Sequence, residues 1–397
     1  MTNISVNLVS TFGPTVRGVS PYSDSLLASL RELDNLRIEP VDYIKQYPNL
    51  LLPSKGKDDT NSKNGYELIH YAKPETWDSF VGNSNEIVHI QYWSPFMATY
   101  LYFIAKRIKF AKKHLIVTVH NADQHEKIPL LKMIEKKFLG LCDAIICHNH
   151  TSATILAERF DAFNPLIKVI HHGVKQSKYD NSKDKRMMYC ASLGLDPEKR
   201  YILFFGNIRP YKGIDLLLEA WSDIKYKHPN TCLIIAGRLW DGSRGILSVI
   251  AAKILGTAKH SLRIKRMAEM NSDSEQLKYL LSFVEQDDLE KLISISCLTV
   301  FPYTKFSGQS GAATLAAGIG TPVLVSNCGS LPDLAVDDRF IFSEISRKRI
   351  AVQLDEVLQN YANFTELRKH QVAKIKPYSW LHSAVAHRDL YREVFRG

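Results

Sequence analysis

The sequence predicts an α/β protein built from two doubly wound parallel sheets. Three observations carry this prediction. The chain has 397 residues, too many for one ordinary core and suited to two domains. Apolar residues make up 45% and charged residues 23%, which is a globular composition. Short apolar segments alternate with longer helical patterns, and such alternation produces parallel sheets covered on both faces.

Two series of candidate strands define the two domains. The first series is expected at residues 4–9, 87–91, 115–120, 144–148 and 167–171. The second is expected at residues 201–205, 232–236, 298–303 and 322–326. Residues 175–185 are polar, lack apolar periodicity and are predicted to be a linker. We therefore expect Rossmann-like domains at 1–174 and 186–378 that face each other across a cleft, with ligands beyond the carboxyl ends of the strands.

Cysteine usage and hydropathy indicate a cytoplasmic protein. The six cysteines are scattered and form no C-x-x-C, which disfavours a zinc module or a disulfide framework. The first residues lack the basic and apolar regions of a signal peptide. The longest apolar runs are about ten residues, whereas a membrane-spanning helix needs about 20.

The net charge of +10 is concentrated in part of the chain. Residues 96–140 carry nine Lys or Arg against three acids, and five of the nine lie in the octet 106–113. Such a surface attracts nucleic acid, anionic lipid or phosphorylated small molecules. No nucleic-acid motif is present, so we expect no nucleic-acid partner. A solvated basic face remains the alternative interpretation.

The first motif that indicates a ligand-binding site is a strand end followed by glycines and cationic residues. Residues 204–213 read FFGNIRPYKG. Gly206 permits a close turn, and Arg209 and Lys212 precede a helix whose apolar positions (214, 217, 218, 221 and 224) share one face. Cations beside a helix N-terminus suit a phosphate or diphosphate. A surface turn with incidental charges is the alternative.

A second loop, residues 303–320, joins a strand to an Ala-rich helix. The amides of Gly308, Gln309, Ser310 and Gly311 are predicted to cradle phosphate oxygens, with Ser307 and Ser310 as hydroxyl donors. The loop is no Walker motif, because the lysine of that motif is absent, and no G-x-G-x-x-G follows the first strand. The alternative is that the small residues of this segment serve only close packing of the helix on the sheet.

A third group of polar residues ends a strand of the first series. His120 is expected at the cleft, followed by Asn121, His125 and Glu126 on a loop. These side chains suit contact with sugar hydroxyls or transfer of a proton. The alternative is a hydrogen-bonded structural histidine.

Other features argue against a metal. The histidines at 148–150 and 171–172 lack partner spacing for a metal and are interpreted as structural or cleft-lining. No D-x-D occurs, and Asp287 and Asp288 are expected to cap a helix. After the first strand, Gly18 is expected to approach a ligand, and Ser20 is a candidate N-cap. We expect no metal and no cofactor.

Together these motifs resemble glycosyltransferase family 4, whose architecture is GT-B. The resemblance covers nearly the whole chain and rests on residues 17–20, 117–120, 206–213, 309–311 and 320–323. The Gln-Ser-Gly loop is similar to a branch found in polysaccharide assembly. The closing stretch, residues 379–397, resembles the family's C-terminal helix that returns to the first domain.

The resemblance implies sugar transfer from a nucleotide-diphosphate donor to an acceptor hydroxyl, without a metal. His120, Arg209 and Lys212 are the implied catalytic residues, with Arg209 replacing the family's arginine at the position of Asn207. The implied donor-binding residues lie on the loops of both domains, at Gly18, Asn207, Arg238, Ser307, Gly308, Gln309, Ser310 and Gly311. Contacts to sugar or acceptor are expected from Asn121, His125 and Glu126.

The chain departs from the family at two glutamates eight positions apart. Ser307 and Leu315 occupy their places, and Leu315 cannot bind a ribose diol. A non-catalytic sugar-nucleotide-binding subunit is therefore an alternative to an active transferase, and a phosphorylase or epimerase is another. The family mostly retains the anomeric configuration, and we expect the same here, since no general base can be chosen between His120 and Glu126.

The basic patch indicates where the acceptor is met. Residues 96–113 and 127–140 mix apolar and basic side chains, a pattern that docks on anionic lipid. The expected acceptor is a glycan or polyprenyl-linked molecule in cell-surface polysaccharide synthesis. We expect a cytoplasmic protein that contacts the inner face of the membrane peripherally.

Overall fold

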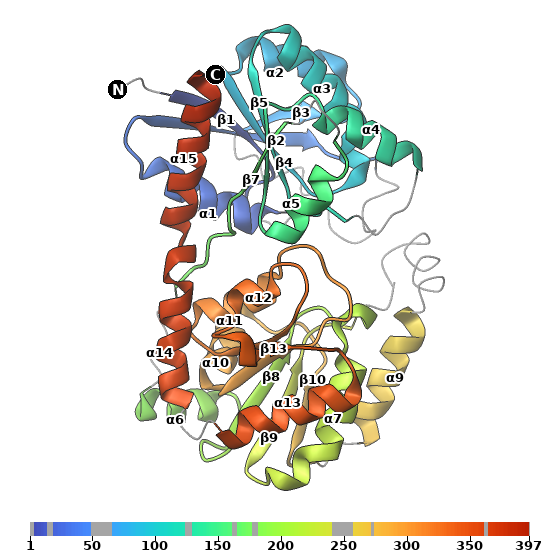
Figure 1. The fold of residues 1–397 in the computed structure, drawn as a ribbon, viewed down its shortest axis with the longest axis vertical. Coiled ribbons are helices and arrows are strands. Elements are labelled where there is room, and N and C mark those ends of the chain that lie inside the picture. The colour runs from blue at the N-terminus through green and yellow to red at the C-terminus, as the bar shows by residue number, and fades with distance from the viewer. Residues whose placement is uncertain are drawn as a thin grey trace. The chain divides into compact units, whose positions relative to one another are not determined.

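The chain folds into two compact α/β units. A computed structural model describes residues 4–13, 19–48, 66–123, 129–160, 165–176, 182–239, 257–270, 274–360 and 364–396. The first unit comprises Met1–Gly173, Ser307–Gln309 and Tyr378–Gly397, and the second comprises Val174–Phe306 and Ser310–Pro377. Each unit contains one parallel sheet with helices around it (Figure 1).

The first unit contains a seven-stranded sheet in the order β3-β2-β1-β4-β5-β6-β7. The strands, all parallel to their neighbours, are β1 (Ile4–Val9), β2 (Leu36–Lys45), β3 (Glu67–His70), β4 (Ile87–Tyr92), β5 (His114–Val119), β6 (Ala144–Cys147) and β7 (Leu166–Val169). The order reverses between β1 and β4, which is the switch point where open parallel sheets bind ligands.

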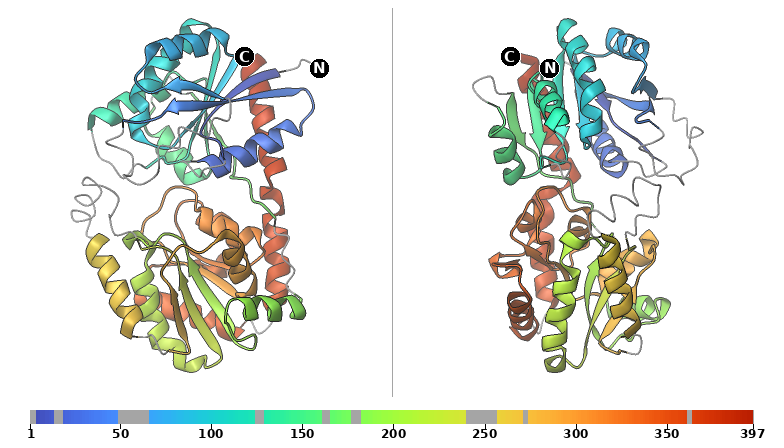
Figure 2. Two further views of the ribbon diagram at one scale, coloured as in Figure 1. Left: turned by 180° about the vertical axis from the view of Figure 1, so that it is seen from behind. Right: turned by 90° about the vertical axis from the view of Figure 1, so that its right-hand side faces the viewer.

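Helices bury both faces of this sheet (Figure 2). They are α1 (Ser20–Arg31), α2 (Pro74–Asn83), α3 (Ala98–Phe110), α4 (Pro129–Leu139), α5 (His150–Ala157) and α15 (Trp380–Arg396). Val9 of β1 packs in a core with residues of α2, α3 and α4, whereas Val6 and Leu8 pack in a second core with residues of α1 and α15. The C-terminal helix α15 lies along α1 and completes the second core.

The second unit repeats the topology with six parallel strands in the order β10-β9-β8-β11-β12-β13. Their bounds are β8 (Arg200–Phe205), β9 (Thr231–Ala236), β10 (Leu277–Leu280), β11 (Leu298–Phe301), β12 (Val323–Ser326) and β13 (Ile341–Phe342). The switch point lies between β8 and β11, whose carboxyl ends lead into the two glycine-containing loops of the sequence.

The helices of the second unit follow the strands and pack on both faces. They are α6 (Lys183–Ser192), α7 (Ile214–Ile224), α9 (Thr257–Met270), α10 (Gln286–Ile295), α11 (Gly311–Gly318), α12 (Leu331–Leu334), α13 (Arg347–Asn360) and α14 (Phe364–Ile375). The five positions that were expected on the apolar face of α7 are all buried. Helix α13 packs beside α7, and α14 packs beside α11.

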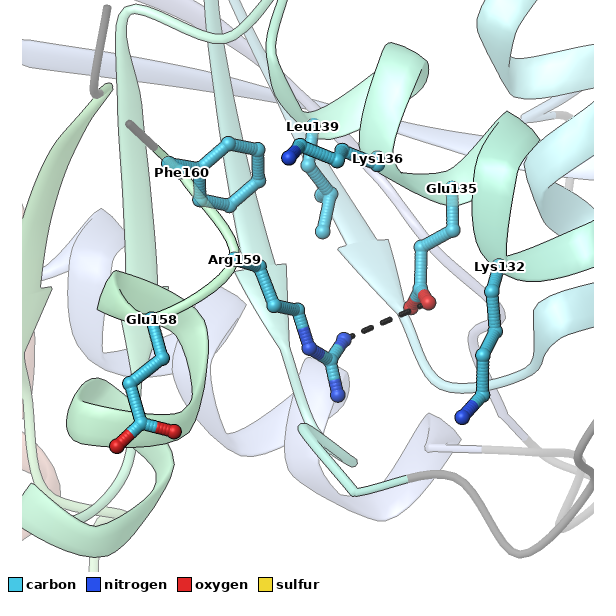
Figure 3. A pocket seen from close by; sticks show the side chains of 7 residues that line it. All are labelled: Lys132, Glu135, Lys136, Leu139, Glu158, Arg159 and Phe160. Carbon is cyan, nitrogen blue, oxygen red and sulfur yellow. Dashed lines mark hydrogen bonds and ion pairs between the residues drawn. The ribbon is translucent and has the colours of Figure 1, made fainter. Parts of the chain in front are cut away.

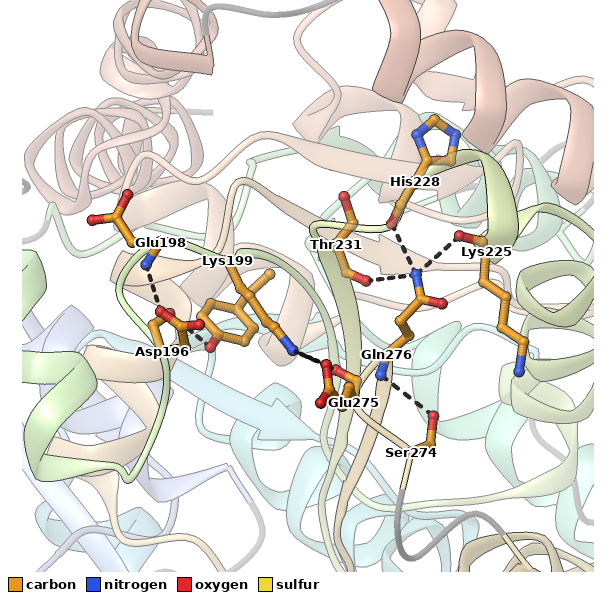
Figure 4. A network of polar contacts seen from close by, with 10 residues as sticks. Asp196, Glu198, Lys199, Lys225, His228, Thr231, Ser274, Glu275 and Gln276 are labelled. Carbon is orange, nitrogen blue, oxygen red and sulfur yellow. Dashed lines mark hydrogen bonds and ion pairs between the residues drawn. The ribbon is translucent and has the colours of Figure 1, made fainter.

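A polar network fixes the edge of the second sheet at which β9 and β10 begin (Figure 4). The side-chain amide of Gln276 donates to the carbonyl oxygens of Lys225 and His228 at 2.9 Å each. Lys199 Nζ lies 3.1 Å from Glu275 Oε2. This network lies at the amino ends of the strands, so it stabilises the edge opposite to the glycine-containing loops.

The structure corrects several details of the sequence prediction. Strands β2, β3, β10 and β13 were not expected. Helix α6 begins at Lys183, so residues 183–185 are helical rather than linker. Val19, not Ser20, is the N-cap of α1, and Ser20 is its first residue. Glu285 is the N-cap of α10, and Asp287 and Asp288 lie in its first turn, where each pairs with Lys291.

A matched pair of glycines tests the packing between β8 and β11. Gly213 (φ +66°) and Gly194 (φ +64°) share a left-handed conformation, but only at Gly213 would a Cβ meet another atom, the carbonyl oxygen of Pro302 at 2.1 Å. Gly194→Ala should lower the free energy of unfolding by about 1–2 kcal/mol, the cost of that conformation. Gly213→Ala should lower the free energy of unfolding by roughly 1–3 kcal/mol more than Gly194→Ala does, because the added methyl group would also overlap with Pro302. Urea unfolding measures both, and equal losses would contradict the packing described.

Candidate functional site

The switch point of the second sheet gathers the predicted phosphate-binding residues of that unit. The turn after β8 begins at Gly206 (φ +109°), whose amide donates to the carbonyl of Ala236 at 3.0 Å. A short 3-10 helix, Pro210–Lys212, then leads into α7. The amide of Thr304, after β11, donates to the carbonyl of Tyr211 at 2.8 Å and joins the two loops. Two strand ends therefore present one continuous edge.

Lys212 is the buried cation of this edge. Its side chain is only 7% exposed, and its Nζ lies 5.3 Å from the centroid of the Tyr303 ring. Among the described residues, none accepts a hydrogen bond from Nζ or forms an ion pair with it. Burial, and to a smaller extent the charge of Arg209, lower the pKa of Lys212 to about 8. The site therefore holds a desolvated ammonium group that an anion would stabilise.

Helix α11 directs its N-terminus at the same place. Ser310 is the N-cap, and its hydroxyl accepts from the amide of Ala313 at 3.3 Å and lies 3.2 Å from the hydroxyl of Tyr303. A Cβ on Gly206 would lie 3.1 Å from Lys212 Nζ and 3.6 Å from the Cβ of Ala312, in the first turn of α11. Glycine at 206 thus keeps space between a cation and a helix N-terminus, which is the arrangement that binds phosphate.

The remaining predicted residues of this edge are more exposed. Asn207, Arg209, Arg238 and Gly311 are exposed, and the carbonyl of Arg238 accepts from the amide of Ile208 at 2.9 Å. The two exposed arginines follow neighbouring strands, β8 and β9. They therefore belong to the same strand edge as Lys212.

Residues of the second predicted phosphate loop divide between the units. Ser310 and Gly311 group with the second unit, whereas Ser307, Gly308 and Gln309 group with the first. Gly308 is buried, and Ser307 and Gln309 are half-buried. Their contact with a donor therefore stays a prediction.

The first unit contains a row of histidines at the carboxyl ends of β5, β6 and β7. His120 follows β5, His148 follows β6 and His172 follows β7. The ring centroids of His120 and His148 are 5.0 Å apart, and those of His148 and His172 are 5.7 Å apart. Tyr22 of α1 packs its ring against all three, at 4.8–5.1 Å.

Burial keeps these imidazoles neutral. It lowers the pKa of His148 to about 3 and that of His172 to about 4. The pKa of His120 lies well below its usual value, chiefly through burial and then through the charges of its histidine neighbours. The row therefore presents aromatic edges and hydrogen-bonding nitrogens rather than positive charge at neutral pH.

The loop after His120 is only partly described. Asn121 is exposed and donates from its side chain to the carbonyl of Trp93 at 3.1 Å. His125 and Glu126 lie outside the described residues, as does Gly18 after β1. Their expected contacts with donor, sugar or acceptor remain predictions.

A cavity of about 340 Å³ in the first unit was not anticipated from the sequence (Figure 3). It is lined by residues of α4 and of the chain after α5, namely Lys132, Glu135, Lys136, Leu139, Glu158, Arg159 and Phe160. Arg159 Nη1 lies 3.5 Å from the buried Glu135 carboxylate, and Nη2 donates to the carbonyl of Ala122. Arg159 thereby fastens the chain that follows His120 to the cavity wall.

The described residues contain no group of three or more His, Cys, Asp or Glu side chains placed to hold a metal ion. All six cysteines lie in the described ranges and are free thiols. No helix in the described part of the chain is long and apolar enough to cross a membrane.

Comparison with protein families gives two matches that together span most of the chain. Residues 189–376 match the model described as glycosyl transferases group 1. Residues 64–178 match the model described as Glycosyltransferase Family 4. The first match falls largely within the second unit, and the second match falls largely within the first unit.

A curated relative is the D-inositol 3-phosphate glycosyltransferase of Streptomyces bingchenggensis. It is 25% identical over 320 residues, which are 79% of this chain and 67% of that protein. A protein of the same description from Mycobacterium sp. is 28% identical over 263 residues, 64% of this chain and 54% of that protein. The chain thus spans about half to two thirds of the length of these relatives.

Solved structures share the fold over the full length. Sucrose-phosphate synthase from Thermosynechococcus elongatus superimposes with a TM-score of 0.69 at 18% identity and covers 99% of both chains. HepE from Anabaena, in complex with UDP and glucose, gives a TM-score of 0.67 at 12% identity and covers 98% of this chain and 100% of its own.

Burial of the charged Lys212 side chain should lower the free energy of unfolding. The folded pKa of Lys212, about 8, lies below the ordinary value of 10.5, so the cost is complete below about pH 8 and disappears as the pH rises through 10.5. Lys212→Met should therefore raise the free energy of unfolding by roughly 3 kcal/mol at pH 7 and by progressively less towards pH 10. Urea unfolding across this range measures it.

The exposed Lys278 provides the control. Lys278→Met should leave the free energy of unfolding nearly unchanged at both pH values, because water already solvates that ammonium group. A Lys212→Met protein no more stable than the wild type at pH 7 would contradict the desolvation described.

Proposed function

We propose that this chain, which belongs to glycosyltransferase family 4, transfers a sugar from a nucleotide-diphosphate donor to a hydroxyl of a glycan or lipid-linked acceptor. One observation carries the proposal: the cation of Lys212 is buried without a hydrogen bond or an ion pair among the described residues, beside Gly206 and the N-terminus of α11. A diphosphate supplies the missing negative charge. Solved structures at this level of identity show the fold alone, so the substrates are proposed from the site itself.

The chemistry of such a transfer depends on the leaving group. A nucleoside diphosphate gains negative charge as its bond to the sugar breaks. Fixed cations and oriented amides that face this charge lower the barrier, because they are already in place when the charge develops. Lys212 and the first-turn amides of α11 are the fixed groups, and the exposed Arg209 adds a second cation.

Donor binding is proposed to need no metal. The sequence lacks D-x-D, and Lys212 and Arg209 supply the charge that a divalent ion would otherwise bring. Asn207, Arg238 and Ser310 are the further proposed donor contacts on this edge. We propose retention of the anomeric configuration, in keeping with the family.

The acceptor is proposed to be lipid-linked and to be met at an anionic membrane in the synthesis of cell-surface polysaccharide. Helix α4 supports this proposal. Its exposed surface combines Leu130 and Met133, 60% and 50% exposed, with Lys132, Lys136 and Lys137. An amphipathic basic helix of this kind inserts apolar side chains between lipids while its lysines contact phosphate headgroups.

One observation favours a second function, that of a non-catalytic sugar-nucleotide-binding subunit. Leu315 lies half-buried in the middle of α11, where the family's ribose-binding glutamate would stand. A subunit of this kind would bind a nucleotide sugar and never break it. Slow hydrolysis of the donor by the purified chain distinguishes the two functions, because only an enzyme releases the nucleoside diphosphate.

Removal of the buried cation tests the proposed enzyme. Lys212→Ala should lower the rate of sugar transfer, or of donor hydrolysis, by about 10²–10³-fold, because one preorganised group facing the leaving diphosphate is lost. The assay measures nucleoside diphosphate released from a panel of nucleotide sugars. The exposed Lys278 is the matched control, and Lys278→Ala should retain full activity. Undiminished turnover by Lys212→Ala would refute the role of Lys212.

Neutralisation of α4 tests the proposed membrane contact. Each basic residue near an anionic surface contributes about 1 kcal/mol, so replacing Lys132, Lys136 and Lys137 by Gln should weaken binding to vesicles containing anionic phospholipid by roughly 100-fold. Sedimentation with vesicles measures the binding. High salt should weaken wild-type binding in the same direction.

Three exposed lysines of the second unit provide the control for charge alone. Replacing Lys348, Lys374 and Lys376 by Gln removes the same charge from another surface and should leave vesicle binding almost unchanged. Equal losses in both triple variants, or no wild-type binding at low salt, would exclude α4 as the docking surface. A water-soluble phosphorylated acceptor would then be the better candidate.

A further inference from the structure

The ammonium group of Lys212 lies over two aromatic rings. Its Nζ is 5.3 Å from the ring centroid of Tyr303 and 5.9 Å from that of Phe204. Both residues are buried, with no more than 1% of either exposed. The face of an aromatic ring carries the negative part of its quadrupole and attracts a cation within about 6 Å, most strongly where water is excluded. The rings therefore stabilise the charged form of a side chain that has no hydrogen bond or ion pair among the described residues.

Tyr303, the nearer of the two rings, is held in place by other aromatic side chains. It packs edge to face against Tyr211 at 5.7 Å, Phe306 at 5.3 Å and Phe301 at 6.0 Å between ring centroids. Its backbone amide donates to the carbonyl of Phe301 at 3.0 Å. The ring needs little rearrangement when an anion reaches Lys212, because packing already fixes its orientation.

The hydroxyl of Tyr303 reaches the other phosphate-binding element of this unit. It lies 3.2 Å from the hydroxyl of Ser310, and either group can donate. Ser310 is the N-cap of α11 and accepts from the amide of Ala313 at 3.3 Å. Burial raises the pKa of Tyr303, so its side chain is an uncharged phenol at neutral pH. One side chain thus contacts both the cation and the helix N-terminus that a phosphate would meet.

We propose that Tyr303 is a positioning residue for the transferase reaction: its ring keeps the Lys212 ammonium group charged, and its hydroxyl fixes Ser310, and with it the N-terminus of α11, beside that charge. This inference rests on the proposed function for its catalytic consequence. Its geometric part stands on contacts within the second unit alone.

The ring and the hydroxyl act on different properties of the site. The ring acts on charge, because attraction to its face favours the ammonium form, so loss of that attraction should lower the pKa of Lys212 below about 8. The hydroxyl acts on geometry, because its hydrogen bond is with Ser310. Arg209 is the other charged group that acts on Lys212, and its guanidinium keeps its charge whatever side chain stands at position 303.

Fluorination of the ring tests its contact with Lys212 without a large change of shape. Tyr303→Phe should leave the pKa of Lys212 within roughly 0.3 units of the wild-type value. Phenylalanine with two and then five ring fluorines at this position should lower the pKa progressively, by about one unit in all, because fluorine withdraws electron density from the face of the ring. Carbon NMR of protein labelled at lysine Cε measures the pKa, and the signal missing in Lys212→Arg identifies Lys212. An unchanged pKa across the series would overturn the role of the ring.

Inorganic pyrophosphate probes the same effect without sugar transfer. Its apparent affinity should scale with the fraction of Lys212 that is charged. A fall of the pKa from about 8 to about 7 lowers that fraction about 5-fold at pH 8 and hardly at all at pH 6. The pentafluorinated protein should therefore bind pyrophosphate about 5-fold more weakly than Tyr303→Phe at pH 8 and almost equally at pH 6.

Calorimetric titration measures both affinities. A shifted pKa of Lys212 with an unchanged affinity for pyrophosphate at pH 8 would overturn the positioning role. A wild-type protein that binds no pyrophosphate would instead refute the proposed function, and the pKa series would still decide whether the ring acts on Lys212.

A double-mutant cycle tests the hydroxyl. Tyr303→Phe should lower kcat by about 3–10-fold, because one hydrogen bond that fixes the helix N-terminus is lost. Ser310→Ala removes the same hydrogen bond from the other side, so the double variant should lose no more activity than Ser310→Ala alone. If the chain turns over no donor, affinity for pyrophosphate replaces kcat in the same cycle. Additive losses, or no loss in Tyr303→Phe, would overturn the link to α11.

Tyr201 provides the matched control. It is a buried tyrosine of β8 in the same unit, and its hydroxyl donates to the carbonyl of Asp196 at 2.8 Å. Tyr201 lies at the amino end of its strand, away from Lys212. Tyr201→Phe should therefore lower stability but leave the pKa of Lys212, the affinity for pyrophosphate and kcat unchanged. Equal effects of Tyr201→Phe and Tyr303→Phe on kcat would contradict a specific role for Tyr303.

Discussion

The desolvated ammonium group of Lys212 is the constraint on which the proposed site depends. A lysine is buried to this extent only at a free-energy cost, since water solvates the charged form far better than a protein interior does. Here the cost is imposed by the fold. The backbone of Gly213 fits against Pro302 with no room for a side chain, and Gly213 directly follows Lys212, the last residue of the 3-10 helix. The ligand that relieves this cost is an anion.

The two units contribute different physical properties to the molecule. The second presents positive charge at the carboxyl edge of its sheet, from Lys212, Arg209 and Arg238. The first presents at the corresponding edge a row of neutral rings, including His120 and His148. Charge suits a departing diphosphate, whereas neutral hydrogen-bonding rings suit an uncharged sugar.

Most of the strands were predicted from hydrophobic patterning, and the exceptions have physical causes. The first strand was predicted at its observed bounds because Ile4, Val6 and Leu8 recur at every second position, which is the period of a strand. Strand β2 was missed because Pro40 interrupts it and Asp42 is polar. Asp42 is nevertheless buried, since its carboxylate accepts from the amides of Phe12 and Tyr43 at 3.2 and 2.6 Å. The shorter strands β3 and β13 carry too few residues for a period to be recognised.

The site was predictable where its residues are adjacent in sequence and not where folding brings them together. Lys212 and Ser310 follow strand ends in glycine-containing segments, and their chemistry is visible in those segments. His148 was interpreted as structural or cleft-lining, and its Nε2 lies 3.3 Å from His120 Nδ1, a contact that depends on strand register and not on a local pattern. The hydroxyl of Tyr391 bonds to His89 across 302 positions, and no local pattern indicates such a contact.

Proton uptake on binding of a nucleoside diphosphate, chosen from a panel by its affinity for the chain, tests the central claim most directly. A diphosphate beside Lys212 should raise its pKa from about 8, so that at a pH just above this value, where the diphosphate is fully ionised, binding should draw a proton from the buffer. Isothermal titration calorimetry in buffers of different ionisation enthalpy gives the number of protons. Uptake in the wild type that is abolished in Lys212→Arg, whose guanidinium is already protonated, is the predicted result. Binding without proton uptake, or identical uptake in both proteins, would contradict the account.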